Sequence, residues 1–210
     1  MTMRELLTRI RGDERGLAFV EFAFVAPVMI FAILGGLELV NYAMAYMKVN
    51  QIAMTVADNA GRVTTGIDEA NIYEVFAGAN SIGESMNFKS RGRIVLSSLQ
   101  DNEKKGNKHG QVINWQRCWG DLAVSSAYGK ENDGRNDSSL KLGMGAAANR
   151  ITSISGTAVM FVEVNYDYQP LISATILPIT TRIHQESAFN VRGRQNNNIS
   201  NAQALAKNTC

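Results

Sequence analysis

The chain has 210 residues, of which 45% are hydrophobic and 19% are charged. With 18 Gly and 3 Pro this is an ordinary folding composition, which excludes collagen-like, low-complexity and wholly disordered proteins. The formal net charge of +2 gives no strong field that would point to a nucleic acid or an acidic substrate. Two Cys and two His are too few for a Cys/His zinc cluster or an iron–sulfur centre.

The first predicted element is an apolar run over residues 17–37, in which Glu21 is the single charged residue. As a helix this run is about 32 Å long, which matches a hydrocarbon core of roughly 30 Å. We therefore predict a transmembrane helix over residues 17–40. A polar, arginine-bearing leader occupies residues 1–16, so the positive-inside bias puts the N-terminus in the cytoplasm and the following chain outside. A cleaved secretory signal, the competing interpretation, requires a shorter apolar run.

Glu21 is costly in this position, by about 2–3 kcal/mol on insertion scales, and an ionisable group in lipid predicts a cationic partner. A cut between Gly16 and Leu17 would create an α-ammonium group one helical turn before Glu21. Between neighbouring helices that are staggered by a turn, the two groups could pair and fix the register of assembly. The alternative is that Glu21 reaches the cytoplasmic interface unpaired, and the residues alone leave both open. Glu38, at the outer end of the run, is expected to extend to the headgroups.

Beyond the membrane the helix is expected to continue to about residue 60, with an apolar stripe that includes Tyr46, Val49 and Val56. A second amphipathic helix is predicted within residues 68–88, with Asp68 as its N-cap and a buried face of Ile72, Val75, Phe76 and Ala79. Alternating apolar residues and intervening turns predict strands over residues 93–99, 111–119, 159–168 and 179–191. A turn is expected at Leu177-Pro178, and a short helix over residues 140–151.

These elements predict an α+β fold in which a long N-terminal transmembrane and amphipathic helix packs on a mostly antiparallel four-stranded sheet. The period-two pattern of residues 159–168 indicates that one face of this sheet is wet. The domain would cover residues 41–192. Residues 193–210 form a polar tail, expected to be loosely ordered.

Cys118 and Cys210 would both lie outside the cytoplasmic membrane, where two thiols usually form a disulfide. No catalytic motif is found, and neither His109 nor His184 has a nucleophile or ligand partner in the sequence. The Gly143-Met144-Gly145 string lacks the third Gly and the preceding strand of a dinucleotide-binding turn. The remaining charges are expected on the surface, among them Glu163, Asp167, Arg192 and Arg194. We expect no enzyme activity, no cofactor and no metal site.

Three strings carry a family resemblance: RGLAFVEFAFVAPVMIFAILGGLEL at the N-terminus, VEVNYDYQPL at 162–171 and SAFNVRGR at 187–194. The first resembles the processing site of type IV prepilins and the N-terminus of the TadE-like proteins of the tight-adherence (Flp-type) pilus system. The other two are similar to that family's closing strands. The resemblance implies a pilin-like fold and cleavage by the prepilin peptidase. Gly16 would be the last residue of the leader, and Leu17 would become the new N-terminus. Glu21, the fifth residue counted from Leu17, would be the carboxylate that the family has at that position.

The expected function is thus that of a minor pilin-like subunit or assembly protein. Its expected partners are the inner membrane, the prepilin peptidase and other pilin-like subunits, with no nucleic acid and no small-molecule substrate. The alternative is a membrane-anchored periplasmic binding or sensory domain that keeps its leader. The expected location is the bacterial inner membrane, as a single-pass protein with a cytoplasmic N-terminus and a periplasmic domain, or the cell surface within a pilus.

Overall fold

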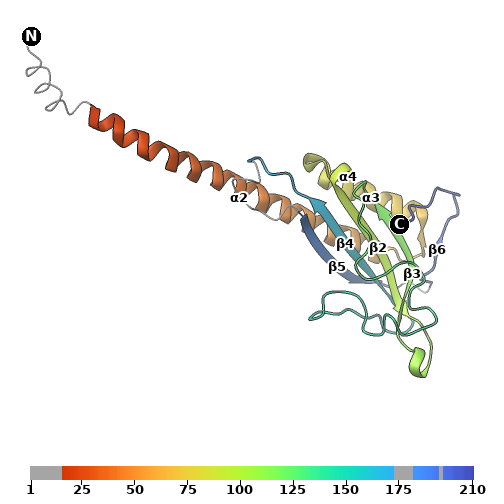
Figure 1. The fold of residues 1–210 in the computed structure, drawn as a ribbon. Coiled ribbons are helices and arrows are strands. Elements are labelled where there is room, and N and C mark those ends of the chain that lie inside the picture. The colour runs from red at the N-terminus through yellow and green to blue at the C-terminus, as the bar shows by residue number, and fades with distance from the viewer. Residues whose placement is uncertain (1–15, 173–181, 194–195) are drawn as a thin grey trace, which may run out of the picture. The chain divides into compact units, whose positions relative to one another are not determined.

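The computed structural model describes residues 16–172, 182–193 and 196–210 (Figure 1). The chain divides into two compact units, one made of Met1–Tyr42 with Pro170–Ile179 and the other of Ala43–Gln169 with Thr180–Cys210. The first unit contains the predicted transmembrane run, and it also includes the connection that follows Gln169. Residues 1–15 of the leader, the predicted turn at Leu177-Pro178 and Arg194 lie outside the described residues.

Helix α2 covers Leu17–Arg62 without interruption and contains Pro27, so the helix ends two residues beyond the expected position. Its buried positions in the second unit recur every three or four residues and include Ala45, Val49, Ile52, Val56 and Ala60. Tyr46 was predicted within this stripe, but it is 46% exposed because Ala45 takes the buried position instead.

The predicted second helix is α3 (Glu69–Gly83), which is followed by the 3₁₀ turn η2 (Glu84–Met86). A further short helix, α4 (Phe88–Arg91), begins where the predicted helix was expected to end. Asp68 caps α3 as predicted: its Oδ1 accepts a hydrogen bond from the Ala70 backbone N–H at 3.1 Å. The side chain of Asn71 accepts one from the Asp68 N–H in return, which completes a capping box. The expected buried face of α3 is confirmed, since all four of its predicted residues are buried.

The central sheet has the strand order β3-β2-β4-β5, and every neighbouring pair is antiparallel. Its strands are β2 (Gly92–Asp101), β3 (Gln111–Trp119), β4 (Ala158–Asp167) and β5 (Arg182–Asn190). The turn η3 (Gly106–Lys108) lies between β2 and β3. The predicted α+β fold with a four-stranded antiparallel sheet is therefore confirmed, and β3 has the predicted bounds.

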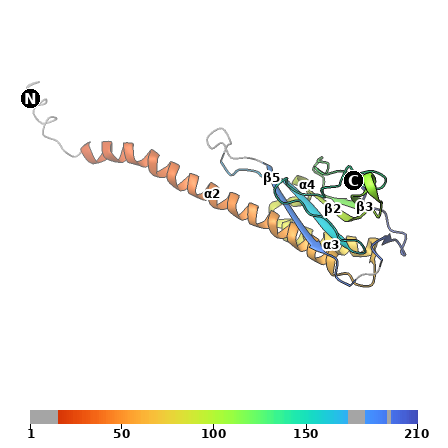
Figure 2. The same ribbon diagram turned by 90° about the horizontal axis from the view of Figure 1, so that it is seen from below.

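The second half of α2 and α3 lie along one side of the sheet, which we call the helix face (Figure 2). A row of aromatic rings fills this side, in which Phe88 stacks on both Trp119 and Tyr166. The first residue of β2 is Gly92. A Cβ atom at that position would lie 2.4 Å from the Phe88 ring, so a larger residue would clash with it.

The other side, which we call the loop face, is also covered, so the expectation of a wet face is wrong. Residues 120–157 form turns and loops, and they enclose a second apolar cluster with Ile113, Leu140, Met144 and Phe161. The predicted short helix over residues 140–151 is absent. Gly143 adopts a φ of 81°, and Met144 instead pairs with Ile151 in an isolated β-bridge. Loops lacking regular periodicity thus provide the second layer.

The C-terminal tail is also more ordered than expected. Its strand β6 (Ile199–Ser200) pairs in parallel with β1 (Ile67–Asp68), immediately before α3. Further along the tail, the Cys118 backbone N–H donates to the Asn208 carbonyl at 2.7 Å. The tail therefore lies against α3 and the free edge of β3.

Candidate functional site

The exposed N-terminal part of α2 is the first candidate site. Its large apolar side chains are open to the surroundings, with Phe19 and Phe24 each 75% exposed. The helix is long and apolar enough to cross a membrane, and its most apolar 18-residue window is 0% buried. A soluble fold would leave such a surface in contact with water at a large cost in free energy. The helix therefore fits a membrane anchor.

The Gly16–Leu17 bond lies directly before the first turn of this helix. Both residues are exposed, and a Cβ atom at Gly16 would have no neighbour within 4 Å. The geometry of this chain therefore does not require a glycine there.

Glu21 lies one turn after Leu17 and is also exposed. Within the part of the chain that the structure describes, its carboxylate makes no hydrogen bond or ion pair.

The family model described as TadE-like protein matches residues 16–58. This segment is similar to the TadE-like family. The match begins at the Gly16 that the sequence strings indicate, and it extends along α2 to Asp58.

Similarity to the TadE-like family over this segment, together with the exposed apolar helix, fits a membrane-anchored protein. The match covers the N-terminal helix and not the α+β domain that follows. No curated protein and no solved structure matches the chain.

Glu38 lies at the outer end of the apolar run, and its side chain is buried where we expected it to extend outward. The residue is 0% exposed, and its Oε2 accepts hydrogen bonds from the backbone N–H groups of Leu171 at 2.8 Å and Ile172 at 3.0 Å. All three residues belong to the first unit. Sequence reasoning did not find this contact, because the amide donors lie 133 and 134 residues further along the chain.

Cys118 and Cys210, the two predicted disulfide residues, are joined in the structure, with Cα atoms 5.0 Å apart. The bond closes a loop with a sequence separation of 92 and attaches the tail to β3. Cys118 is 5% exposed whereas Cys210 is exposed, so the bond joins a buried position on β3 to the surface.

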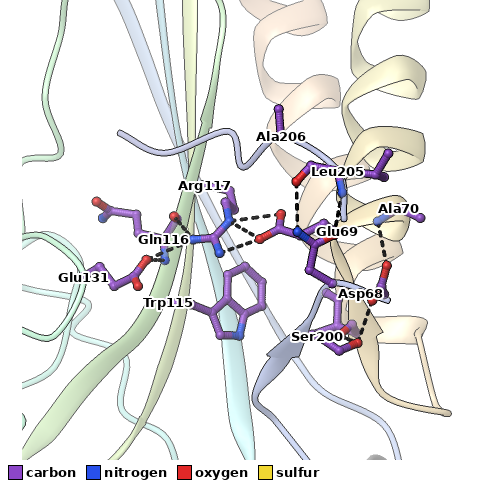
Figure 3. A network of polar contacts seen from close by, with 12 residues as sticks. Asp68, Glu69, Ala70, Trp115, Gln116, Arg117, Glu131, Ser200, Leu205 and Ala206 are labelled. Carbon is purple, nitrogen blue, oxygen red and sulfur yellow. Dashed lines mark hydrogen bonds and ion pairs between the residues drawn. The ribbon is translucent and has the colours of Figure 1, made fainter. Parts of the chain in front are cut away.

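A buried ion pair stands next to this attachment. Arg117 on β3 binds Glu69 at the start of α3, and both side chains are almost completely enclosed (Figure 3). The Nη1 atom of Arg117 also forms an ion pair with Oε2 of the half-exposed Glu131, at a distance of 2.9 Å. The guanidinium is thereby held between α3 and the loop that follows β3, and these carboxylates raise the pKa of Arg117 despite its burial.

The loop face holds a second buried carboxylate. Glu163 was expected on the surface, but it is 1% exposed because residues 120–157 cover β4. The Ser126 hydroxyl and the Ala127 N–H donate hydrogen bonds to it. Burial raises the pKa of the Glu163 carboxyl above its ordinary value, even though these donors act in the opposite direction.

His184 lies beside this carboxylate on β5. It is partly exposed, with Nδ1 2.9 Å from Asn165 and Nε2 2.9 Å from Glu186. The described residues contain no group of three or more His, Cys, Asp or Glu side chains that could hold a metal ion. In the Gly143-Met144-Gly145 string, Met144 forms the β-bridge with Ile151 described above.

A pocket of about 430 Å³ opens on the loop face near the disulfide. Its walls include Arg93, Gln116, Lys130 and Cys210. The Nε atom of Arg93 is buried and has no hydrogen-bond partner in the described part of the chain, while its Nη1 donates to the Gly120 carbonyl at 2.8 Å. A small anion would match this guanidinium, although Asp133 also lines the pocket.

Proposed function

We propose that the chain is a minor pilin-like subunit or assembly protein of a tight-adherence pilus, with a structural and not a catalytic role. The observation that carries the proposal is the TadE-like match, which begins at Gly16 immediately before an exposed apolar helix. The precursor would lie in the inner membrane with its leader in the cytoplasm and its α+β domain outside.

The proposed maturation is hydrolysis of the Gly16–Leu17 peptide bond by the prepilin peptidase, with this chain as substrate. Water adds across the bond, so that Gly16 gains a carboxylate and Leu17 gains an amino group, which is protonated at neutral pH. The new ammonium and Glu21 carry opposite charges. In a medium of low dielectric constant their attraction is strong, and pairing between neighbouring helices would fix the register of the subunits. The exposed position of Glu21 supports this role.

The mass of the intact protein extracted from membranes tests this proposal. In cells with an active prepilin peptidase, we expect a chain that begins at Leu17. In otherwise identical cells that lack the peptidase, we expect the uncleaved leader. A chain that keeps its leader in cells with working pili would overturn the proposal.

The second candidate function is a membrane-anchored binding or sensory domain that never enters a pilus. It is favoured by the pocket around Arg93, whose buried Nε atom has no partner among the described residues. The same mass measurement separates the two functions, because this candidate requires no cleavage.

A further inference from the structure

The connection between β4 and β5 leaves the second unit at Pro170 and joins the first unit beside α2. Its first described residues are Leu171, which is 70% exposed, and Ile172, which is partly buried. Between Asp167 and Arg182 the sequence contains no charged residue. An exposed leucine in an uncharged stretch, next to a membrane helix, suggests a surface that meets an apolar environment.

Glu38 defines the depth of this connection. A helix that starts at Leu17 rises about 32 Å by residue 38, which equals the thickness of a hydrocarbon core within a few ångströms. The carboxylate therefore lies where the hydrocarbon ends and the headgroups begin. Because its Oε2 accepts from the N–H groups of Leu171 and Ile172, these two residues lie at the same level.

The hydrogen bonds also explain how a backbone segment can lie at this depth. Backbone N–H groups without partners are strongly disfavoured near hydrocarbon, and Glu38 supplies the acceptor for two of them. The buried carboxylate gains two donors in return. The contact satisfies polar groups on both sides and leaves the Leu171 side chain exposed next to the apolar surface of α2.

We propose that Leu171, with the neighbouring Ile172, inserts into the outer boundary of the lipid bilayer as a second membrane contact, held there by Glu38. The inference rests on the membrane placement of α2 in the proposed function. A lipid surface is the occupant because Leu171 is bound to Glu38, and the residues on either side of Glu38 in the helix, Leu37 and Leu39, are exposed as well. A second anchor of this kind fixes the depth and rotation of the helix in the membrane.

Quenching of tryptophan fluorescence by brominated lipids tests the proposal. The full chain is reconstituted in phosphatidylcholine vesicles that carry bromine either near the carbonyl end or near the methyl end of the acyl chains. Leu171→Trp is the reporter, and the signal of the native chain, which contains Trp115 and Trp119, is subtracted. Phe24→Trp is the positive control, because Phe24 is exposed within the apolar run. Ile154→Trp is the matched control, since Ile154 is 79% exposed but lies on the loop face of the second unit.

We expect the Leu171→Trp signal to be quenched by the shallow bromines and the Phe24→Trp signal most strongly by the deep ones, with no loss for Ile154→Trp. If Phe24→Trp is quenched and Leu171→Trp behaves like Ile154→Trp, the second contact is disproved while the membrane helix stands. If Phe24→Trp is not quenched, the membrane placement itself fails. The Leu171→Trp signal is also measured at several protein-to-lipid ratios. If bromine quenching of this tryptophan is lost when the ratio is high, a second copy of the chain covers the residue, and this result would also overturn the proposal.

The role of Glu38 is tested in the same vesicles. We expect Glu38→Ala to abolish the quenching of Leu171→Trp, because both N–H groups lose their acceptor, and to leave the quenching of Phe24→Trp unchanged. Glu38→Gln keeps one carbonyl oxygen and should retain part of the effect. If Glu38→Ala leaves the Leu171→Trp signal unchanged, Glu38 does not hold the connection in place.

Discussion

Arg117 donates three hydrogen bonds to Glu69: from Nε to Oε1 at 2.8 Å, from Nε to Oε2 at 3.1 Å and from Nη2 to Oε1 at 2.6 Å. Their side chains are only 3% and 1% exposed. The pair joins the edge strand of the sheet to the start of α3, where β1 and the tail also meet (Figure 3). A charged pair that is buried this deeply depends on both of its members.

We expect Arg117→Ala to lower the free energy of unfolding by about 3–5 kcal/mol, because it leaves the Glu69 carboxylate buried without its partner. Glu131→Gln is the matched control. Its side chain is 42% exposed, so its loss should cost at most about 1 kcal/mol. Denaturant unfolding of the full chain in detergent measures both. Equal effects of the two variants would contradict a special role for the buried pair.

Gly16→Ala should prevent cleavage of the leader, which intact mass would reveal as a chain that is not shortened. The added methyl group has no neighbour within 4 Å, so the variant should fold like the native chain. Gly35→Ala is a suitable control, since that position is equally open. It should be cleaved normally. Production of a chain that begins at Leu17 from Gly16→Ala would refute the assigned site.

Glu21→Gln should be cleaved normally but should fail to assemble, because the neutral amide cannot pair with the new ammonium group. Its melting temperature should match that of the native chain, since Glu21 has no partner within the described residues. Counts of surface pili and recovery of the subunit in sheared pili provide the readout, with the exposed Glu74→Gln as control. Normal piliation would favour the interpretation in which Glu21 only reaches the interface.

Replacement of both cysteines by serine should destabilise the α+β domain by about 4–5 kcal/mol at most, the chain-entropy value for a loop of this length. The segment before the disulfide has other contacts, including the hydrogen bond from Trp115 Nε1 to the Asn197 carbonyl at 3.0 Å. Hydrogen exchange should therefore accelerate near residue 208 more than near residue 199. Uniform acceleration along the tail would show that the disulfide holds all of it.

The raised pKa of Glu163 predicts a loss of stability as the pH rises. Below the ordinary pKa of 4.5 the carboxyl is protonated in both the folded and the unfolded state, so its titration does not change the free energy of unfolding there. As the pH rises from there through the raised pKa, the unfolded state loses its proton first and the folded state becomes less favourable. Glu163→Gln lacks this titration, and its stability relative to the native chain should improve over this window.

Denaturant unfolding at a series of pH values, from below the ordinary pKa of 3.8 for Asp137 to above the ordinary pKa of 4.5 for Glu163, would measure this difference. Asp137→Asn is the control of opposite sign, because hydrogen bonds from Ser139 lower the pKa of Asp137. The native chain should gain stability relative to Asp137→Asn as the pH rises through that lowered pKa. Parallel curves for Glu163→Gln and the native chain would contradict the prediction.

The regular elements could be predicted from the sequence because their signals are local. The apolar run gives α2, Asp68 marks the start of α3, and alternating side chains give the strands. The second layer on the loop face could not be predicted, because its cover consists of turns without a repeating apolar pattern. Glu163 was therefore placed in solvent.

Functional residues divide in the same way. Gly16, Leu17 and Glu21 could be proposed as the processing and assembly residues because a short string contains all three. Glu38, Arg117 and Glu69 were missed as partners, since each depends on contacts between distant segments. One signal was present for Arg117: it lies two residues from both Trp115 and Trp119, so it shares their face of the strand, and a charge on such a face needs a partner when it is buried.

The parallel pairing of Ile67 with Ile199 has a consequence for the order of folding. A ribosome synthesises α2, α3, β2 and β3 well before it makes the residues that pair with β1, which closely follow β5. Until then, the outer edge of β3 and the beginning of α3 stay without their final neighbours. Such distant pairing is slow to form, so a nascent domain would wait for its last segment before it closes.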